Sequence, residues 1–370
     1  MSQNTRIQKF KKDMKEMWAL EYMKFILRIF PTEEARQYAC FNNLSVNPNV
    51  TWDIVCKYPD YPWKYHRLAG NPNITLDIIR NNPQIRWDYF MVSRNPNITW
   101  EYIMENPGFR WSWTCLSSNA AITPEIIQNN LHQEWDWHSM SFNPNLTLEF
   151  WQLHKDKRWN WDVISSKKFI TLDVILENPR LPWNWAGVSL NPNITWDMIQ
   201  ANPKIPWLPS HVSGNPNITF DIVLANPDYE WSWMWLSQNK NITPEIVMEN
   251  MEMPWNSITI SHNPNIDIKF VAGNLHQMFD WRMLSQNPGI KMEDYRYNTR
   301  YPWNLEYLCG HKFEADREEF MEKQAIKYMA VYRIKKWWLR LKYDPRTKIG
   351  RRYAMQLYNE NFDSNMDAAA

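Results

Sequence analysis

A unit of 24 residues recurs eleven times in this sequence without an insertion or a deletion. A fixed period of this length is typical of solenoid proteins, in which each unit packs only against the units before and after it. The repeat therefore predicts the architecture, and it moves the question of function from a catalytic pocket to an extended surface. The units begin at Asn47, Asn71, Asn95, Asn119, Asn143, Lys167, Asn191, Asn215, Asn239, Asn263 and Asn287.

The first half of each unit predicts a short helix. Its fifth position is Thr in nine units, as at Thr75, and Asp267 or Lys291 in the last two. Thr and Asp are favoured helix N-cap residues, and the acidic residue at the seventh position of ten units suits the positive end of a helix dipole. An Asn-Pro pair at the twelfth and thirteenth positions, as at Asn82 and Pro83, then ends the helix after about two turns.

The second half of each unit predicts another helix of one or two turns, which is short enough to be partly 3₁₀. Its eighteenth position is Asp, Asn or Ser in nine units and supplies a second N-cap. The seventeenth position is Trp in ten units and Phe279 in the other, which predicts a ladder of rings through the array. We expect these rings to be buried and not to form a stacking platform for single-stranded nucleic acid, because so many exposed rings would promote aggregation.

The pattern N-P-N-x-T-P/W-E/D, followed by a short helix, an Asn-Pro or Asp-Pro break and a second short helix, resembles the leucine-rich repeat variant family over residues 47–310. The resemblance implies an all-α solenoid in which α- and 3₁₀-helices alternate in a right-handed superhelix. The Trp-x-Trp of the second segment departs from that family, which usually carries small aliphatic residues and Arg there. The bias towards Asn, Ile and Trp and the segment IKKWWLRLKYDPRTKIGRR resemble uncharacterised repeat proteins of giant DNA viruses, which implies a location in the host cytoplasm or the virion.

Both ends of the chain depart from the repeat. We expect residues 1–46 to form an N-terminal helical cap with an amphipathic helix over 5–30, because the open end of a solenoid exposes its core. Residues 47–310 form the solenoid, and at roughly 8–10 Å per layer the array would be about 100 Å long. Residues 311–370 form a basic helical C-terminal segment, with a helix over 314–342 and a frayed end.

Positive charge is concentrated in this C-terminal segment. Residues 47–310 carry a formal net charge of −6, which argues against general nucleic-acid binding along the array, whereas residues 331–352 hold nine basic residues and one acidic residue. Three interpretations stay open: a cap whose apolar stripe packs on the last unit, a basic face for nucleic acid or an acidic protein, and a helix that binds a calmodulin-like protein or a membrane surface. The candidate partner-binding residues are Arg333, Lys335, Lys336, Arg340, Lys342, Arg346, Lys348, Arg351 and Arg352.

A second candidate surface lies where the units depart from the consensus, between residues 119 and 169. Repeat proteins often bind partners where the consensus is broken, so we expect a contact region there. Its candidate residues are His154, Lys155, Lys157, Arg158, Lys167 and Lys168.

The chemistry of enzymes is sparse in this chain. It has eight glycines and lacks the glycine-rich phosphate-binding motifs, G-x-S-x-G and H-E-x-x-H. Helix capping explains the acidic column at the seventh position, and His132 and His138 lie in a unit that otherwise follows the repeat, so we do not expect an active site or a metal site there.

The cysteines and the apolar segments of the chain also indicate a cellular compartment. The four scattered cysteines form no C-x-x-C pair and fit a reducing compartment, and we find neither a signal-peptide core nor an apolar run long enough to span a membrane. We therefore predict a cytoplasmic, non-enzymatic scaffold for a protein partner, without a cofactor. The alternative is that the basic helix 331–352 binds nucleic acid or an acidic partner and the solenoid is a spacer.

Overall fold

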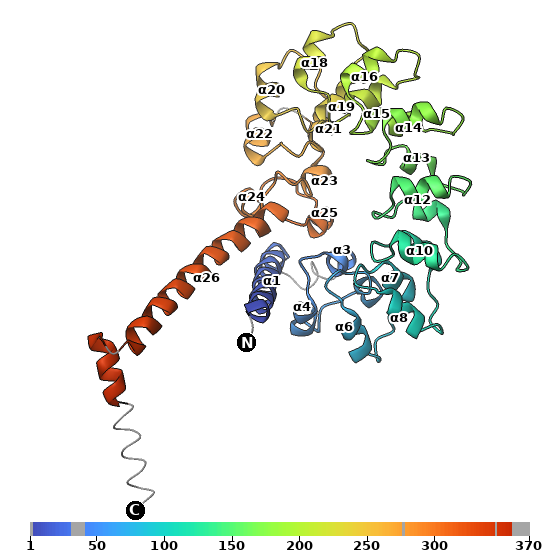
Figure 1. Ribbon diagram of the computed structural model, residues 1–370. Helices are drawn as coiled ribbons and strands as arrows, with labels where there is room; N and C mark the ends of the chain where they lie inside the picture. The colour runs from blue at the N-terminus through green and yellow to red at the C-terminus, as the bar shows by residue number, and fades with distance from the viewer. Residues whose placement is uncertain (1–2, 31–40, 276–277, 345, 357–370) are drawn as a thin grey trace, which may run out of the picture. The chain divides into compact units, whose positions relative to one another are not determined.

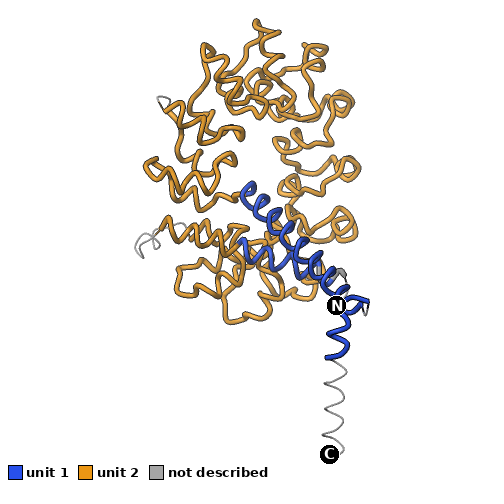
Figure 2. Tube along the Cα trace, turned by 90° about the vertical axis from the view of Figure 1, so that its left-hand side faces the viewer, with its two compact units in different colours: residues 1–18, 314–370 blue, residues 19–313 orange. Residues whose placement is uncertain are grey.

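A computed structural model describes residues 3–30, 41–275, 278–344 and 346–356, and all regular secondary structure in these ranges is helical. Many short helices follow one another in a regular series, which confirms the all-α repeat fold (Figure 1). The chain divides into two compact units, residues 19–313 and residues 1–18 with 314–370, coloured separately in Figure 2. These boundaries differ from the expected ones, because the division falls within the N-terminal helix α1 (Gln3–Ile29).

Each 24-residue unit contributes a first and a second helix. The first helices are α4 (Trp52–Lys57), α6 (Leu76–Asn81), α8 (Trp100–Glu105), α10 (Pro124–Asn129), α12 (Leu148–Leu153), α14 (Leu172–Glu177), α16 (Trp196–Ala201), α18 (Phe220–Ala225), α20 (Pro244–Glu249), α22 (Ile268–Gly273) and α24 (Met292–Tyr297). The second helices are α5 (Tyr65–Leu68), α7 (Tyr89–Arg94), α9 (Trp113–Ser117), α11 (Trp137–Met140), α13 (Trp161–Ile164), α15 (Trp185–Leu190), α17 (Pro209–Ser213), α19 (Trp233–Ser237), α21 (Ser257–Ile260), α23 (Trp281–Leu284) and α25 (Leu305–Gly310). Helix α3 (Phe41–Val46) precedes the first full unit and occupies the place of a second helix.

The predicted N-caps form. The Thr at the fifth position accepts a hydrogen bond from the backbone N–H three residues later in all nine units that carry it, as Thr99 does from Tyr102 at 3.2 Å. Asp267 caps α22 in the same way, whereas at Lys291 the Asp294 carboxylate accepts the backbone N–H of the cap residue at 2.8 Å. Each first helix is six residues long and is held by its cap and its neighbours, because so short a helix is unstable alone.

The second helices are α-helical in the structure and span four to six residues, so the expected alternation of α- and 3₁₀-helices is not observed among the described residues. Shorter i→i−3 hydrogen bonds occur at their ends, as from Arg67 N–H to Lys64 O at 2.8 Å. The Asn-Pro break between the helices is fixed by the Trp that follows it. In the unit that begins at Asn95, Trp111 Nε1 donates to Asn106 O at 3.0 Å, and Asn106 Nδ2 donates back to Tyr102 O at 2.8 Å.

A ladder of asparagines joins each unit to the one before it. Asn215, which is fully buried, donates from Nδ2 to Ser189 O at 2.8 Å and to Asn191 O at 3.0 Å, and its Oδ1 accepts the N–H of Asn217 at 2.8 Å. Asn217 in turn donates to Pro192 O at 2.7 Å. The recurring Asn-Pro-Asn turn therefore joins neighbouring units, where buried carbonyls need these donors.

A second ladder is made of serines at the twenty-third position. The hydroxyl of Ser213 donates to Pro209 O at 2.7 Å and accepts the N–H of Ser232 in the next unit at 2.9 Å. Ser93 bridges its own helix and the next unit in the same way through Tyr89 O and Ser112 N–H. These serines are fully buried, so a Ser in this column is a structural element and not a surface residue.

The tryptophan rings of the second segment are buried or half-buried, as expected, but they do not stack face to face. The ring at the nineteenth position of one unit meets the Trp at the seventeenth position of the next edge-on. Trp113 and Trp135 have ring centroids 5.1 Å apart at 89°, and Trp233 and Trp255 are 5.0 Å apart at 85°. Edge-to-face pairs of this kind contribute about 0.5–1.5 kcal/mol each beyond the burial of apolar area.

The array closes on itself. Asn47 Nδ2 donates to Cys309 O at 3.0 Å and to His311 O at 3.1 Å, which are the atoms that the ladder register requires of a preceding unit. Asn49 Nδ2 donates to Lys312 O at 2.7 Å, as Asn217 does to Pro192 O. Helix α3 packs against α25, so the twelve described second helices, from α3 to α25, form a closed ring (Figure 1).

This closure corrects the expectation of an open array about 100 Å long. The second helices face the middle of the ring and the first helices its outside (Figure 1). Each unit adds a small rotation to the last, and the eleven units together with α3 bring the two ends of the array into contact.

The C-terminal half of α1 reinforces the closure. Tyr22, which is fully buried, donates its hydroxyl to Cys309 O at 3.3 Å and accepts Asn47 Nδ2 at 3.1 Å, and burial raises the pKa of this phenol. Phe25 lies edge-on to Phe313 with centroids 5.3 Å apart. The N-terminal helix is therefore buried at the junction of the two ends of the array, which we call the seam.

The other compact unit contains the start of α1 and the long helix α26 (Glu314–Tyr343). The two helices run antiparallel, because Trp18 contacts Phe320 and Phe10 contacts Tyr328, with centroids 5.5 and 4.2 Å apart. A short helix over 348–356 follows a turn at Asp344, and Tyr353 lies edge-on to Tyr343 at 5.4 Å.

Candidate interaction surfaces

The residues in which the units differ divide into those used by the fold and those left at the surface. Lys167 stands at the first position, where the other units carry Asn, and its Nζ donates to Asn143 O at 2.9 Å. Burial lowers the pKa of this amine. Lys167 therefore substitutes for an Asn in the ladder, and its neighbour Lys168 is the exposed member of the pair.

His154 is likewise used by the fold. It replaces the Asn of the Asn-Pro break, lies 3.0 Å from Gln128 Oε1 through Nε2, and accepts Trp159 Nε1 at its backbone carbonyl at 2.8 Å. Burial lowers the pKa of its imidazole, and the nearby Lys157 adds to this effect. A buried imidazole between the Trp137 and Phe150 rings is a packing residue, so His154 is not presented at the surface.

The remaining candidates of this region lie at the surface. Lys157 pairs with Asp156 at 3.3 Å and lies over the Trp137 ring, and Arg158 is exposed. Lys155 is half-buried, because its Nζ donates to Asn178 Oδ1 at 2.9 Å. Of the six candidates, Lys157, Arg158 and Lys168 are thus exposed together with Leu153, and we call these four residues the broken-consensus surface.

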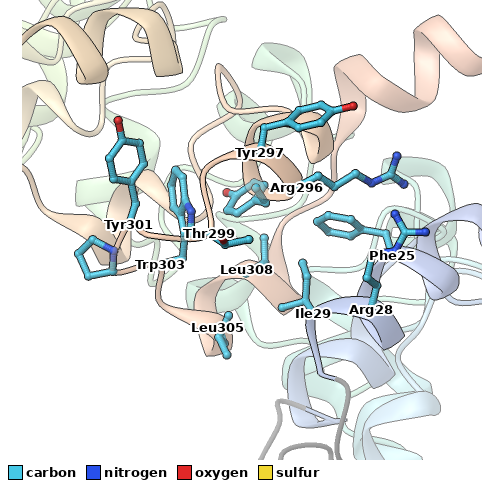
Figure 3. Close-up of a pocket in the computed structure, with 12 residues that line it drawn as sticks. Phe25, Arg28, Ile29, Arg296, Tyr297, Thr299, Tyr301, Trp303, Leu305 and Leu308 are labelled. Atoms are coloured by element: carbon cyan, nitrogen blue, oxygen red, sulfur yellow. The ribbon is translucent and has the colours of Figure 1, made fainter.

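A cavity of about 590 Å³ lies at the seam. In Figure 3, Phe25, Arg28 and Ile29 of α1 lie on one side of it and Tyr301 and Trp303 on the other. Tyr295, Arg296, Tyr297, Thr299, Pro302, Leu305 and Leu308 complete the lining. The lining holds two exposed guanidinium groups and aromatic walls but no carboxylate, thiol or imidazole, so it offers shape and positive charge without a nucleophile or a general base. Sequence reasoning missed this cavity, because it exists only where the two ends of the array meet.

The basic residues of the C-terminal segment are exposed. Every residue from 331 to 340 is exposed, including Arg333, Lys335, Lys336 and Arg340, and Lys342 is half-buried beside the Tyr353 ring. The other residues of its own compact unit leave the apolar stripe of this helix uncovered, since Trp337 is 60% and Ile334 63% exposed.

Beyond this helix the basic candidates continue in the turn and the short helix. Arg346 forms a bidentate pair with Asp344, with the Nη2–Oδ2 distance at 2.8 Å, and this pair lowers the pKa of Asp344 to about 2. Lys348, Arg351 and Arg352 are exposed.

The remaining chemistry of the described ranges is limited. No cluster of three His, Cys, Asp or Glu side chains in them is placed to hold a metal ion, and no helix in them is long and apolar enough to cross a membrane. Cys56 and Cys115 are free thiols, whereas Cys309 is disulfide-bonded.

Fold and surfaces together define the class of the molecule: an all-α repeat protein whose 24-residue units close into a ring. Comparison with known proteins adds no narrower assignment, because no protein family, no curated protein and no solved structure matches the chain.

Proposed function

We propose that the protein is a non-enzymatic scaffold that binds a protein partner through the outward surface of its repeat ring. The observation that carries this proposal is that the repeated positions of the 24-residue unit hold the fold together, whereas variable positions lie at the surface. The repeated side chains, such as Asn215, Ser213 and Thr99, are committed to bonds within and between units, whereas residues that vary between units, such as Leu153 and Arg158, are exposed. A rigid frame with variable side chains on its surface is the arrangement that repeat proteins use for recognition.

The broken-consensus surface is the part of the ring that we assign to the partner. It combines the 66% exposed Leu153 with the cations Lys157, Arg158 and Lys168 on an otherwise acidic array. An exposed apolar side chain and exposed cations at a non-repeating place fit a protein surface that carries acidic groups. By resemblance alone, the proposal includes a cytoplasmic or virion location.

The experiment compares two variants of the full chain. In the first, Lys157, Arg158 and Lys168 are changed to Glu. In the matched control, Arg86, Arg110 and Lys204, which are exposed on three other units, are changed to Glu. Both variants carry the same change in net charge, and circular dichroism with urea unfolding checks that both fold.

Capture from nuclease-treated lysate, read by mass spectrometry, then gives the answer. The proposal expects a set of proteins that the unaltered chain and the control retain and that the first variant loses. If both variants retained the same proteins, the broken-consensus surface would be rejected as the binding site. If capture from lysate without nuclease retained nucleic acid and no protein, the protein-scaffold function would be rejected.

A further inference from the structure

The end of α26 extends past the helix that it packs against. Trp18 with Phe320 and Phe10 with Tyr328 are eight residues apart on both helices and fix an antiparallel register. In this register Gln3, where α1 begins, comes level with Lys335. Residues 336–343 therefore continue as a helix beyond the start of α1.

Two opposite faces of this helical end are apolar. Ile334, Trp337, Trp338 and Leu341 follow the i, i+3, i+4, i+7 spacing of one helix face. Tyr332, Leu339 and Tyr343, at i, i+7 and i+11, lie on the other side, and all three are exposed. The apolar surface is thus not a single stripe of the kind that packs on one neighbour.

Two basic edges separate these apolar faces. Lys335 and Lys342 are seven residues apart on one edge, and Arg333, Lys336 and Arg340 share the other. Residues 324–343 contain six basic residues and no acidic residue. Looking down the axis, apolar and basic sectors therefore alternate around the helix.

This alternation discriminates between kinds of partner. A membrane surface contacts one face of a helix and favours a polar opposite face, which Leu339 and Tyr343 do not provide. A nucleic-acid backbone needs a continuous basic face, which Trp337 and Trp338 interrupt. A protein groove with two apolar walls and acidic rims contacts all four sectors at once, as in helix-in-groove recognition.

We propose that residues 332–343 form a docking helix for an acidic protein whose apolar groove closes around both sides of the helix. The assignment goes beyond the scaffold function, because it needs no residue of the repeat ring. Complementary charge selects the partner, and the two apolar faces require a groove with two walls.

Calcium-loaded calmodulin is the probe, because it is acidic and opens an apolar, methionine-rich groove for basic amphipathic helices. Isothermal titration of the full chain should give a 1:1 complex with a Kd of about 1 µM or tighter, since anchors of this size usually support such affinity. The double variant Trp337→Ala, Trp338→Ala should weaken binding about tenfold or more, and so should Leu339→Ala with Tyr343→Ala on the opposite face.

A matched control separates specific docking from charge. Lys335→Gln, Lys336→Gln and Arg340→Gln should weaken binding, whereas Lys9→Gln, Lys11→Gln and Lys12→Gln, which remove three exposed charges from α1 of the same compact unit, should not. All altered side chains are exposed, so the variants should keep the helical content of the unaltered chain.

Several outcomes overturn the docking helix. The first is no heat of calmodulin binding at a concentration of about 50 µM, on the order of the weakest specific interfaces. The second is an equal loss of affinity in the α1 control variant. The third is a loss of affinity in the Trp337, Trp338 variant but not in the Leu339, Tyr343 variant. Tighter binding to phosphatidylserine vesicles or to duplex DNA than to calmodulin would replace the protein groove by a lipid or nucleic-acid partner. None of these results bears on the broken-consensus surface, so the two proposals fail independently.

Discussion

Replacing Asn47 with Ala removes the side chain that joins the first full unit to the last. Its Nδ2 donates to Tyr22 Oη, Cys309 O and His311 O, and its Oδ1 accepts Asn49 N–H at 2.9 Å. Cys309 O keeps the bond from Tyr22, so the substitution removes the Asn47 bonds of two further buried groups, His311 O and Asn49 N–H. The reference is Asn215→Ala in the middle of the array, which removes bonds from Ser189 O, Asn191 O and Asn217 N–H.

The size of the effect follows from the number of groups left unsatisfied. Losing the bond of a buried donor or acceptor costs about 1–3 kcal/mol, which gives about 2–6 kcal/mol for the two groups of Asn47→Ala and about 3–9 kcal/mol for the three groups of Asn215→Ala. In an open array Asn47 would face water, its partners would be hydrated, and the cost would be under about 1 kcal/mol. The closed ring and an open array therefore predict different losses in the free energy of unfolding for Asn47→Ala, and the difference exceeds the error of urea unfolding.

Urea unfolding, followed by tryptophan fluorescence and circular dichroism, measures both variants beside the unaltered protein. The exposed Asn81→Ala is the control and should leave the midpoint unchanged. A closed ring requires losses of similar size for Asn47→Ala and Asn215→Ala. A large loss for Asn215→Ala with an unchanged midpoint for Asn47→Ala would refute the reasoning.

Three further substitutions test single elements of the ladders by urea midpoints. Lys167→Asn restores the ladder residue and should stabilise the protein by about 1 kcal/mol at pH 7. Because burial lowers the pKa of Lys167, the charged amine destabilises the folded protein at every pH below that lowered pKa. The stability gained by the substitution should therefore shrink as the pH rises towards the ordinary lysine pKa of 10.5. A gain that grows with pH would contradict this. Ala69 stands where the next nine units carry the buried Ser, so Ala69→Ser should add an acceptor for Asp88 N–H and stabilise by about 1 kcal/mol; no change would argue against the serine ladder. Gly289→Asn restores the consensus and should nevertheless destabilise by about 1–3 kcal/mol, because a Cβ would lie 2.2 Å from Ile266 O; a stabilised protein would show that the turn can shift.

Local signals predicted the elements of each unit well. The Thr99 cap, the acidic first turn and the Asn106-Pro107 break act within one or two helical turns, so their residue types carry the information. The burial of the tryptophans was also predictable from their number. The edge-to-face geometry of Trp113 on Trp135 was not, because it depends on the offset between successive units.

Closure could not be predicted from one unit, because it depends on the small rotation that is added eleven times. Two fragments of the sequence do indicate that the repeat continues beyond the eleven full units at both ends. Leu44-Ser45 matches the end of a unit before Asn47, and His311-Lys312 occupies the first two positions of a unit after the last. His311 acts as a ladder residue, with Nε2 2.9 Å from Asn287 O and Nδ1 accepting Phe313 N–H.

For the candidate sites, too, the sequence predicted some features and not others. The sequence identified the basic C-terminal residues and the apolar stripe through Trp337, but it left open whether that stripe is covered, and only the structure shows it exposed. Lys167 and His154 were expected at a contact surface because they break the consensus. They break it with side chains that still donate or accept the bonds the fold needs, which residue type alone does not reveal.

The most direct measurement of the closed ring is the distance across the seam in solution. Spin labels introduced through non-natural amino acids at Asn42 and Glu306, which are exposed on α3 and α25, leave the cysteines intact. Asn43 Nδ2 lies 3.1 Å from Glu306 O, so double electron–electron resonance should show the two labels in close proximity. A distribution centred near the length of an open array, about 100 Å at the spacing of packed helices, or a dipolar signal too weak to measure, would contradict the ring.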